Sequence, residues 1–437
     1  IYNKRMIQIL LLLILFSFVF TLIFFTKLRY YGFVSGIFAV AKNESTMGVT
    51  AGFTAGWSVP ALVGSAIVIA WGAEAAQFII SQGAALAVLA WLQVMPEFAV
   101  EAAIAHSATI NPSLIHLVTA NFTGANRLLI GVGWPLIFFT SYYFRKKEAK
   151  LLKHQILLDE EHSVEVVTLI IPSIYFIYIY IKGSLDIIDS AMLIFIYLVY
   201  IWILLRVPPQ DINKAIHAHK IPRKIINYKK SVRNTIIILC FIIGGVILLF
   251  SAEPFLHSML VIASLFGLSA FVFVQWVAPF MSEFPEKLSA FYWASTIRFA
   301  PMALMNMISS KINHWTVLIA MIPMVFVIFG RIYTISFDEF QKHEILLTMV
   351  QSWLGVVCLL KMRFTFIDAV LLFTLWYIQF MFSPDVCSML GLPDVRTIII
   401  PVYIIFAVIL LIIHRKEILV FRAFKNVWKR YISEKGN

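Results

Sequence analysis

Residues 84–108 read AALAVLAWLQVMPEFAVEAAIAHSA, an apolar run that carries Pro96 and Glu97 near its centre. A membrane-spanning helix needs about 20 mostly apolar residues to cross a hydrocarbon core of roughly 30 Å, so this run is long enough. A carboxylate at that depth costs several kcal/mol unless it is paired, hydrated or protonated. The stretch therefore predicts a membrane helix that is interrupted at Pro96, and it indicates that Glu97 has a functional role inside the membrane.

Runs of the same kind recur along nearly the whole chain. Of its 437 residues, 61% are hydrophobic and 13% are charged, and the mean hydropathy is +0.89, which excludes a soluble globular protein. The runs are continuous and rich in Leu, Ile and Phe, whereas a β-barrel would show short alternating segments. We therefore predict an all-α polytopic membrane protein with about 12 spans. These spans are expected near residues 5–26, 57–81, 84–108, 112–144, 163–182, 185–206, 234–257, 262–295, 299–330, 344–361, 365–383 and 396–414.

The positive charge is concentrated in the loops. The net charge is +12, and the basic segments near residues 145–154, 214–233, 361–363 and 414–435 all fall on one side of the predicted membrane. Basic loops face the cytoplasm, so both termini are expected there, in a plasma (bacterial inner) membrane. These loops predict contact with anionic lipid, and no basic stripe with stacking aromatics indicates nucleic acid. The acidic loops, including Asp338-Glu339 with Glu344, fall on the opposite side.

The two halves of the chain repeat one order of features. A proline-glutamate pair ends at Glu97 in the first half and at Glu286 in the second, and an asparagine follows one helix later, as Asn121 and Asn306. Five predicted spans separate the two copies, an odd number, so the copies have opposite orientation in the membrane. Inverted repeats place a binding site near the midplane of the membrane, where broken helices line it. We expect the breaks at residues 95–97, at Pro279 and Pro285, and at residues 306–311.

Carboxylate and amide oxygens are ligands for a cation. Ca²⁺ prefers six to eight oxygens, which Glu97, Glu286, Asn121, Asn306, backbone carbonyls at the breaks and water could supply. Glu97 and Glu286 are the predicted metal ligands, and protons could take the place of the cation on them. Competition between two ions for one site is antiport. The alternative is that Glu97 and Glu286 form fixed salt bridges between helices. Their partners would then come from Lys287, Lys311, Arg127 and Arg298.

Three further acidic residues have weaker signals. Glu101 lies one helical turn after Glu97 and could share its face, but the matching position in the second half is Ala290. Glu74 and Glu253 lie near predicted span ends, where a side chain reaches water easily. The sequence leaves the roles of these residues open.

These motifs resemble the sodium/calcium exchanger family, in a bacterial branch. Each repeat of that family carries a serine-x-proline-glutamate-like element and a later glycine-asparagine-rich element. The resemblance covers roughly residues 57–144 and 234–330. It also includes Gly72-Ala73-Glu74-Ala75-Ala76, Asn126-Arg127-Leu128-Leu129-Ile130-Gly131, Gln275-Trp276-Val277-Ala278-Pro279 and Ser309-Ser310-Lys311.

The resemblance implies a ten-helix core of two inverted five-helix repeats, here with one extra span at each end. It also implies that Glu97 and Glu286 are the central cation ligands, with the two asparagines beside them. Gln93, Ser282 and Glu283 stand at or next to the positions before the proline and join the candidate cation-binding set. The chain departs from the family pattern at these positions, where Glu283 adds a carboxylate. A second departure is Lys311, which replaces a final asparagine and could compensate charge.

The domains follow from this division. They are an N-terminal span with an outward loop (1–56), a first repeat (57–206), a basic cytoplasmic loop (207–233), a second inverted repeat (234–383) and an extra span with a basic tail (384–437).

The predicted function is a secondary active antiporter that exchanges Ca²⁺ or another cation for Na⁺ or H⁺ by alternating access. No P-loop motif is present, the three cysteines have no metal-ligand spacing, and neither an enzymatic activity nor a cofactor is expected. The alternative is a membrane subunit that has the exchanger fold but does not transport, because a Lys/Glu salt-bridge cluster locks its site.

Overall fold

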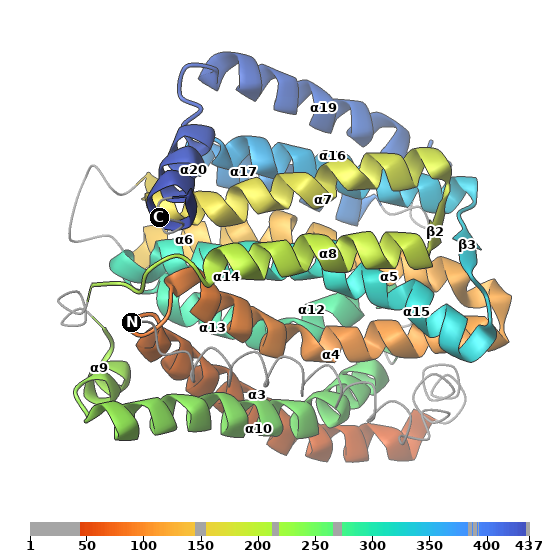
Figure 1. Cartoon of the computed structure of the whole chain (residues 1–437). Helices are drawn as coiled ribbons and strands as arrows, with labels where there is room; N and C mark the ends of the chain where they lie inside the picture. Colours follow the sequence, from red (N-terminus) through yellow and green to blue (C-terminus); the bar gives the residue numbers. More distant parts are fainter. Residues whose placement is uncertain are drawn as a thin grey trace.

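The computed structural model of the chain describes residues 44–144, 154–211, 218–264, 273–382, 387, 391 and 393–433. Long helices lie side by side in one bundle, as Figure 1 shows. Within the described residues, eight helices are long and apolar enough to cross a membrane, and the shorter apolar helix Phe366–Met381 adds to them. The predicted all-α membrane class is confirmed. The predicted first span, near residues 5–26, lies outside the described residues.

The first half of the chain supplies the helices up to residue 204. They are α3 (Glu44–Ala76), α4 (Gln82–Ile110), η2 (Pro112–Leu114), α5 (Ile115–Leu128), η3 (Leu129–Gly133), α6 (Trp134–Phe144), η4 (Glu160–His162), α7 (Ser163–Lys182) and α8 (Ile187–Leu204).

The second half supplies the rest. Its helices are α9 (Lys220–Ile226), α10 (Lys230–Ser264), η6 (Phe273–Val277), α12 (Ala278–Ser282), α13 (Phe284–Ala294), η7 (Ile297–Phe299), α14 (Ala300–Asn313), η8 (His314–Leu318), α15 (Ile319–Gly330), α16 (Glu339–Leu359), α17 (Phe366–Met381), α19 (Val395–His414), α20 (Val420–Trp428) and η9 (Lys429–Ser433).

Only one of the three predicted sets of breaks is a true interruption. Helix α12 ends at Ser282 and α13 begins at Phe284, with Glu283 between them, next to Pro285. The predicted break at residues 95–97 is wrong, because α4 continues through Pro96. One proline removes a single backbone hydrogen bond, and a membrane helix packed by its neighbours tolerates that loss.

The predicted break at residues 306–311 is also wrong. Helix α14 runs through this polar stretch without interruption, and the irregularity comes later, as the π turn η8. Its counterpart α5 also continues into a π turn, η3. Polar side chains need not break a helix whose backbone bonds stay intact, whereas a π turn adds one residue and often lies at a functional site.

Two short antiparallel strand pairs connect the halves of the chain. The sequence did not predict these strands. Strand β1 (Gln155–Leu157) pairs with β4 (Arg363–Thr365), and β2 (Ser184–Asp186) pairs with β3 (Thr334–Ser336). Each pair contains one strand from either half. Figure 1 shows β2 and β3 together at one end of the bundle.

The turns that precede α8 and α17 are built alike. Lys182 pairs with Asp189, seven residues later, and Lys361 pairs with Asp368 at the same spacing. In both turns the residue after the lysine has a positive φ, which is 69° at Gly183 and 54° at Met362. The strand that follows ends in the N-cap residue of the helix. The same corner is therefore formed once in each half.

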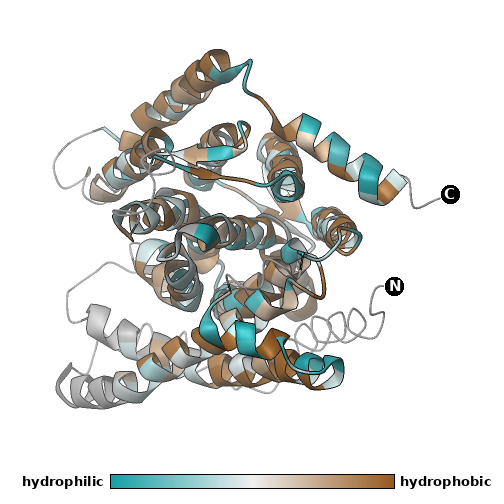
Figure 2. Cartoon of the chain, turned by 90° about the vertical axis from the view of Figure 1, so that its left-hand side faces the viewer, coloured by the Kyte–Doolittle hydropathy of each residue, from teal (hydrophilic) through white to brown (hydrophobic). Residues whose placement is uncertain are grey.

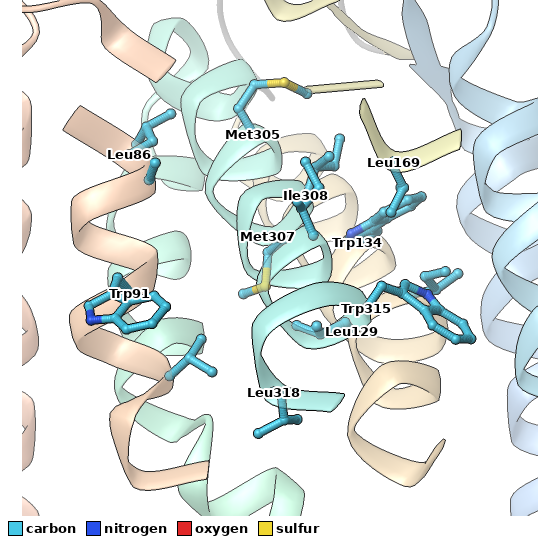
Figure 3. Close-up of a cluster of buried hydrophobic side chains, with 14 of the residues drawn as sticks. Leu86, Trp91, Leu129, Trp134, Leu169, Met305, Met307, Ile308, Trp315 and Leu318 are labelled. Carbon is cyan, nitrogen blue, oxygen red and sulfur yellow. The ribbon is translucent and has the colours of Figure 1, made fainter. Parts of the chain in front are cut away.

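The interior of the bundle is apolar and combines both halves. Figure 3 shows Trp91 of α4 and Trp134 of α6 around Met307 of α14 and Trp315 of η8. Large apolar side chains also point outward, among them Ile404, Ile405, Ile412 and Ile413 on α19. Figure 2 shows this hydrophobic character over the outer helices. A surface of this kind is suited to lipid rather than water.

Gly124 permits the closest approach between α5 and the second half. A Cβ at this position would lie 1.8 Å from the backbone oxygen of Gln275 in η6. We expect Gly124→Ala to force these elements apart and to destabilise the fold by at least about 1–3 kcal/mol, since added atoms in a packed core strain their surroundings. Thermal unfolding in detergent measures this.

Gly64→Ala is the matched control. Gly64 lies inside α3, and a Cβ there would meet nothing within 4 Å. Because alanine favours a helix more than glycine by about 0.5–1 kcal/mol, this variant should be at least as stable as the wild type. Equal stability of the two variants would show that α5 and η6 are not in close contact at Gly124.

Candidate functional site

Glu97 lies buried on α4 and is bonded by side chains from two other helices. Its Oε1 accepts a hydrogen bond of 2.7 Å from Nδ2 of Asn121 on α5. Its Oε2 accepts one from the hydroxyl of Ser282, at the end of α12. All three side chains are buried. The structure therefore brings three predicted site residues together around one carboxylate, with contributions from both halves of the chain.

Glu101 belongs to the same group. Asn121 donates a second hydrogen bond through Nδ2, of 2.7 Å, to Oε2 of Glu101. One amide thus holds two buried carboxylates that lie one turn apart on α4. Oε1 of Glu101 and Oδ1 of Asn121 receive no hydrogen bond from the described part of the chain. The sequence identified Glu101 only as a neighbour on the same helix face.

Gln93 joins α4 to the turn that carries Glu286. Its Nε2 donates to the Ser289 hydroxyl at 2.9 Å and lies 3.4 Å from the carbonyl of Pro285, both on α13. Its Oε1 accepts a long hydrogen bond of 3.4 Å from Asn306 on α14. Gln93 is therefore a cross-connection between the halves. Ser289, which completes it, was not among the predicted residues and has no motif that would have indicated it.

Glu286 lies in the first turn of α13 and is fully buried. Neither of its carboxylate oxygens forms a hydrogen bond within the described residues, and the same holds for Oδ1 of Asn306. Helices α13 and α4 pack against each other. Ser282 of α12 bonds Glu97, and Gln93, one turn before Glu97 on α4, bonds α13 close to Glu286. Within the described residues, no hydrogen bond joins the two carboxyl groups directly.

Glu283 occupies the interruption between α12 and α13. It is buried and forms an ion pair with Lys287, one turn later on α13. Its other oxygen, Oε1, lies 3.6 Å from Nδ1 of His314. Part of the predicted bridge between glutamates and Lys287 is therefore present, but it involves Glu283 rather than Glu97 or Glu286.

The alternative that Arg127 forms a fixed bridge to the site glutamates is wrong. Arg127 forms an ion pair with Glu344 on α16. The Glu344 carboxylate also accepts hydrogen bonds of 2.7 Å from Arg396 of α19 and of 2.6 Å from Gln275. Glu344 is buried rather than part of an acidic loop, because α16 begins five residues earlier than its predicted span and two guanidinium groups stabilise the carboxylate.

Arg298 is exposed and forms no ion pair among the described residues. It therefore does not bridge to the site glutamates.

The position of Glu74 near a predicted span end suggested that its side chain reaches water, but it does not. It is buried and accepts hydrogen bonds from the backbone N–H of His219 at 2.7 Å and from the indole of Trp293 at 3.2 Å. The side chain of Glu253 lies outside the described part of the chain.

The chemistry of the site is that of oxygen ligands. In the described residues, no three His, Cys, Asp or Glu side chains cluster tightly enough to hold a metal by themselves. The buried oxygens without a donor belong to both carboxylate and amide groups: Oε1 of Glu101, Oδ1 of Asn121, Oε1 and Oε2 of Glu286, and Oδ1 of Asn306. Such a mixed set suits a hard cation, which accepts amide, carbonyl and water oxygens beside carboxylates.

Comparisons with known proteins agree with this fold. The family described as sodium/calcium exchanger protein matches residues 47–206 and 236–383. The crystal structure of an H⁺/Ca²⁺ exchanger, CAX, is 30% identical, with a TM-score of 0.70 over 99% of this chain and 100% of that one. Among curated proteins, no sequence matches the chain.

Two more distant structures share the fold alone. The sodium/calcium exchanger from Methanococcus jannaschii is 16% identical, with a TM-score of 0.55 over 76% of this chain and 98% of that one. The exchanger NCX_Mj soaked with Na⁺ and Sr²⁺ is 15% identical, with a TM-score of 0.57 over 76% and 98%. Members of the matched family are secondary transporters rather than enzymes, and they move Ca²⁺ and Na⁺ or H⁺ without a cofactor. This chain, an integral multi-pass membrane protein, belongs to the sodium/calcium exchanger family of cation antiporters.

Proposed function

We propose that this chain exchanges Ca²⁺ for protons across the membrane by alternating access, with Glu97 and Glu286 as the central ligands. The observation that carries the proposal is the buried Glu97 carboxylate, bonded by Asn121 and Ser282 from two halves of the chain. A carboxylate at this depth needs compensation, and a bound cation or a proton provides it. Alternation between the two is the chemistry of an antiporter.

The ligand set supports a divalent cation. Asn121 turns its amide nitrogen toward Glu97 and Glu101, so its Oδ1 remains available as a ligand. Glu286 and Asn306 add oxygens from the second half, and the interruption at Glu283 adds backbone carbonyls. With water, these groups can supply the roughly six to eight oxygens that Ca²⁺ prefers.

The coupling ion is proposed to be H⁺ rather than Na⁺. The structure that is similar over 99% of this chain is that of an H⁺/Ca²⁺ exchanger, whereas the sodium/calcium exchanger structures cover 76–77% of it at 15–17% identity. Buried carboxylates bind protons whenever the metal leaves. A proton that occupies Glu97 or Glu286 removes the charge that attracts Ca²⁺, which couples the two ions.

The repeated features support two inverted copies that rock around the site. The corners at Lys182 and Lys361 occur once in each half, and each strand pair joins one half to the other. In this proposal residues 57–206 and 234–383 are the two copies. The basic loop 207–233 and both termini face the cytoplasm, where anionic lipid contacts them.

A second candidate is an exchanger fold without transport. The buried Glu283–Lys287 ion pair favours it, because a lysine already neutralises one site carboxylate. In that case the cluster would act as a fixed bridge, and loss of Glu97 would affect stability rather than ion flux.

Flux measurements separate the two candidates. In proteoliposomes, a pH gradient should drive ⁴⁵Ca²⁺ uptake by the wild type, and Glu97→Gln or Glu286→Gln should abolish it, because a neutral amide keeps the size but neither attracts the cation nor binds a proton. Glu417→Gln is the matched control, since Glu417 is on the surface and pairs with Arg363. It should transport normally.

Three outcomes contradict the proposal, each at a different point. Equal flux in the wild type and both site variants would reject the site, and wild-type protein without any ion-driven ⁴⁵Ca²⁺ uptake would support the second candidate. Uptake that a Na⁺ gradient drives and a pH gradient does not would replace H⁺ with Na⁺ as the coupling ion.

Asn121→Ala tests how the site carboxylates are positioned. The substitution removes both hydrogen bonds that orient Glu97 and Glu101. Loss of a group that orients ligands typically costs about 10–100-fold in metal affinity, and we expect a loss in this range. Ca²⁺ titration of purified protein by calorimetry measures it. Asn426→Ala is the control, because the Asn426 side chain donates its hydrogen bond to Glu160, an exposed residue outside the proposed site. Unchanged affinity in Asn121→Ala would remove Asn121 from the site.

A further inference from the structure

Lys311 is held in the way that proteins hold a free cation. It lies on α14 and is fully buried. Its Nζ donates a hydrogen bond of 2.9 Å to the backbone carbonyl of Asn126 on α5. It also lies 4.9 Å from the centre of the Trp315 ring. A carbonyl oxygen and an aromatic face are both ligands for a positive charge, and the interaction with the ring strengthens where water is excluded.

Structural lysines of this chain are held differently. Lys361 lies 2.8 Å from a carboxylate oxygen of Asp368, and Lys182 pairs with both Asp186 and Asp189. Within the described residues, by contrast, no carboxylate oxygen lies within 4.0 Å of the Lys311 ammonium. Lys311 interacts with Glu283 only through the longer-range attraction between their charges. It is therefore not one half of a fixed ion pair.

The position of Lys311 connects the equivalent segments of the two halves. Lys311 follows Asn306 by five residues on α14, and Asn126 follows Asn121 by five residues on α5. A π turn comes soon after each of them, η3 in the first half and η8 in the second. The hydrogen bond from the ammonium group thus joins one of these two positions to the other and links α14 to α5.

The charges around the site leave no need for a monovalent cation. Four buried acidic residues surround it: Glu97, Glu101, Glu283 and Glu286. Two buried ammonium groups, those of Lys287 and Lys311, oppose them. With all of these groups ionised, the excess is two negative charges, which equals the charge of one divalent cation. Without Lys311 the excess would be three, and one more positive charge, from a monovalent cation or a proton, would be needed beside the divalent cation.

We propose that the Lys311 ammonium is a covalently attached cation that occupies the place of a Na⁺ ion beside the divalent site. This inference rests on the proposed function and deepens it, because it assigns the residue that excludes Na⁺. The Asn126 carbonyl, the Trp315 face and the negative site together form the position that the ammonium fills.

Lys311→Gln tests the proposal through ion binding. Glutamine removes the charge and leaves the Asn126 carbonyl in place, so Na⁺ should bind where the ammonium was. Binding to the folded state alone raises stability with ligand concentration. We expect the unfolding temperature of purified Lys311→Gln to rise saturably by a few °C when choline chloride is replaced by NaCl at equal ionic strength. The wild type and Lys311→Arg should show no such rise.

Lys361→Gln is the matched control. It also removes a buried lysine, but its partner Asp368 lies in the corner before α17. This variant should lose stability, because it leaves the Asp368 carboxylate without its ion pair, and Na⁺ should not restore it specifically. In proteoliposomes, Lys311→Gln should carry ²²Na⁺ together with ⁴⁵Ca²⁺, and the wild type should carry none.

Four outcomes would overturn the proposal: saturable Na⁺ stabilisation of the wild type or of Lys311→Arg, ²²Na⁺ transport by the wild type, or a folded Lys311→Gln variant that Na⁺ does not stabilise. If Lys311→Gln does not fold, the wild type and Lys311→Arg still decide, because Na⁺ stabilisation of either would overturn it. The unfolding assay requires no transport. If the wild type shows no ⁴⁵Ca²⁺ flux, the proposed function alone is contradicted. If the wild type shows normal flux but Na⁺ does not stabilise the folded Lys311→Gln variant, this inference alone is contradicted.

Discussion

A charged carboxylate deep in a membrane protein must be compensated, and the Glu97 carboxylate is the group around which this structure is organised. Asn121 and Ser282 bring a hydrogen-bond donor to each of its oxygens, and they belong to different halves of the chain. The halves must therefore pack together before Glu97 is satisfied. The donors do not remove the negative charge, so a cation or a proton is still required. In the proposed function, binding and exchange of cations meet this requirement.

The remaining structure positions these groups. Gly124 allows α5 to approach η6 closely, and the interruption at Glu283 separates α12, which carries Ser282, from α13, which carries Glu286. The network of Glu344 with Arg127 and Arg396 connects α5 to α16 and α19, so α19, which lies beyond the residues that match the family, helps to hold α5 in place. A buried ion pair of this kind is costly to break, since the loss of one partner leaves an unpaired charge.

The sequence predicted the membrane class, because apolar runs obey strong energetic rules, and its resemblance to the exchanger motifs predicted that Glu97, Asn121 and Ser282 converge. It did not predict that α4 continues through Pro96, because the sequence of one helix does not show the neighbouring helices whose packing stabilises it despite the lost hydrogen bond. It placed Glu344 in a loop because its arginine partners are distant in the chain. Ser289 has no motif, and only the packing of α4 on α13 reveals it.

The central claim is that oxygens from both halves hold one divalent cation between them. Anomalous scattering from Ca²⁺ in crystals of the wild-type protein tests it directly. The account predicts one strong peak inside the bundle, about 2.3–2.6 Å from carboxylate oxygens of Glu97 and Glu286, the usual range for calcium and oxygen. A Ca²⁺-saturated crystal with peaks only at the protein surface, or with a buried peak that neither glutamate contacts, would contradict it.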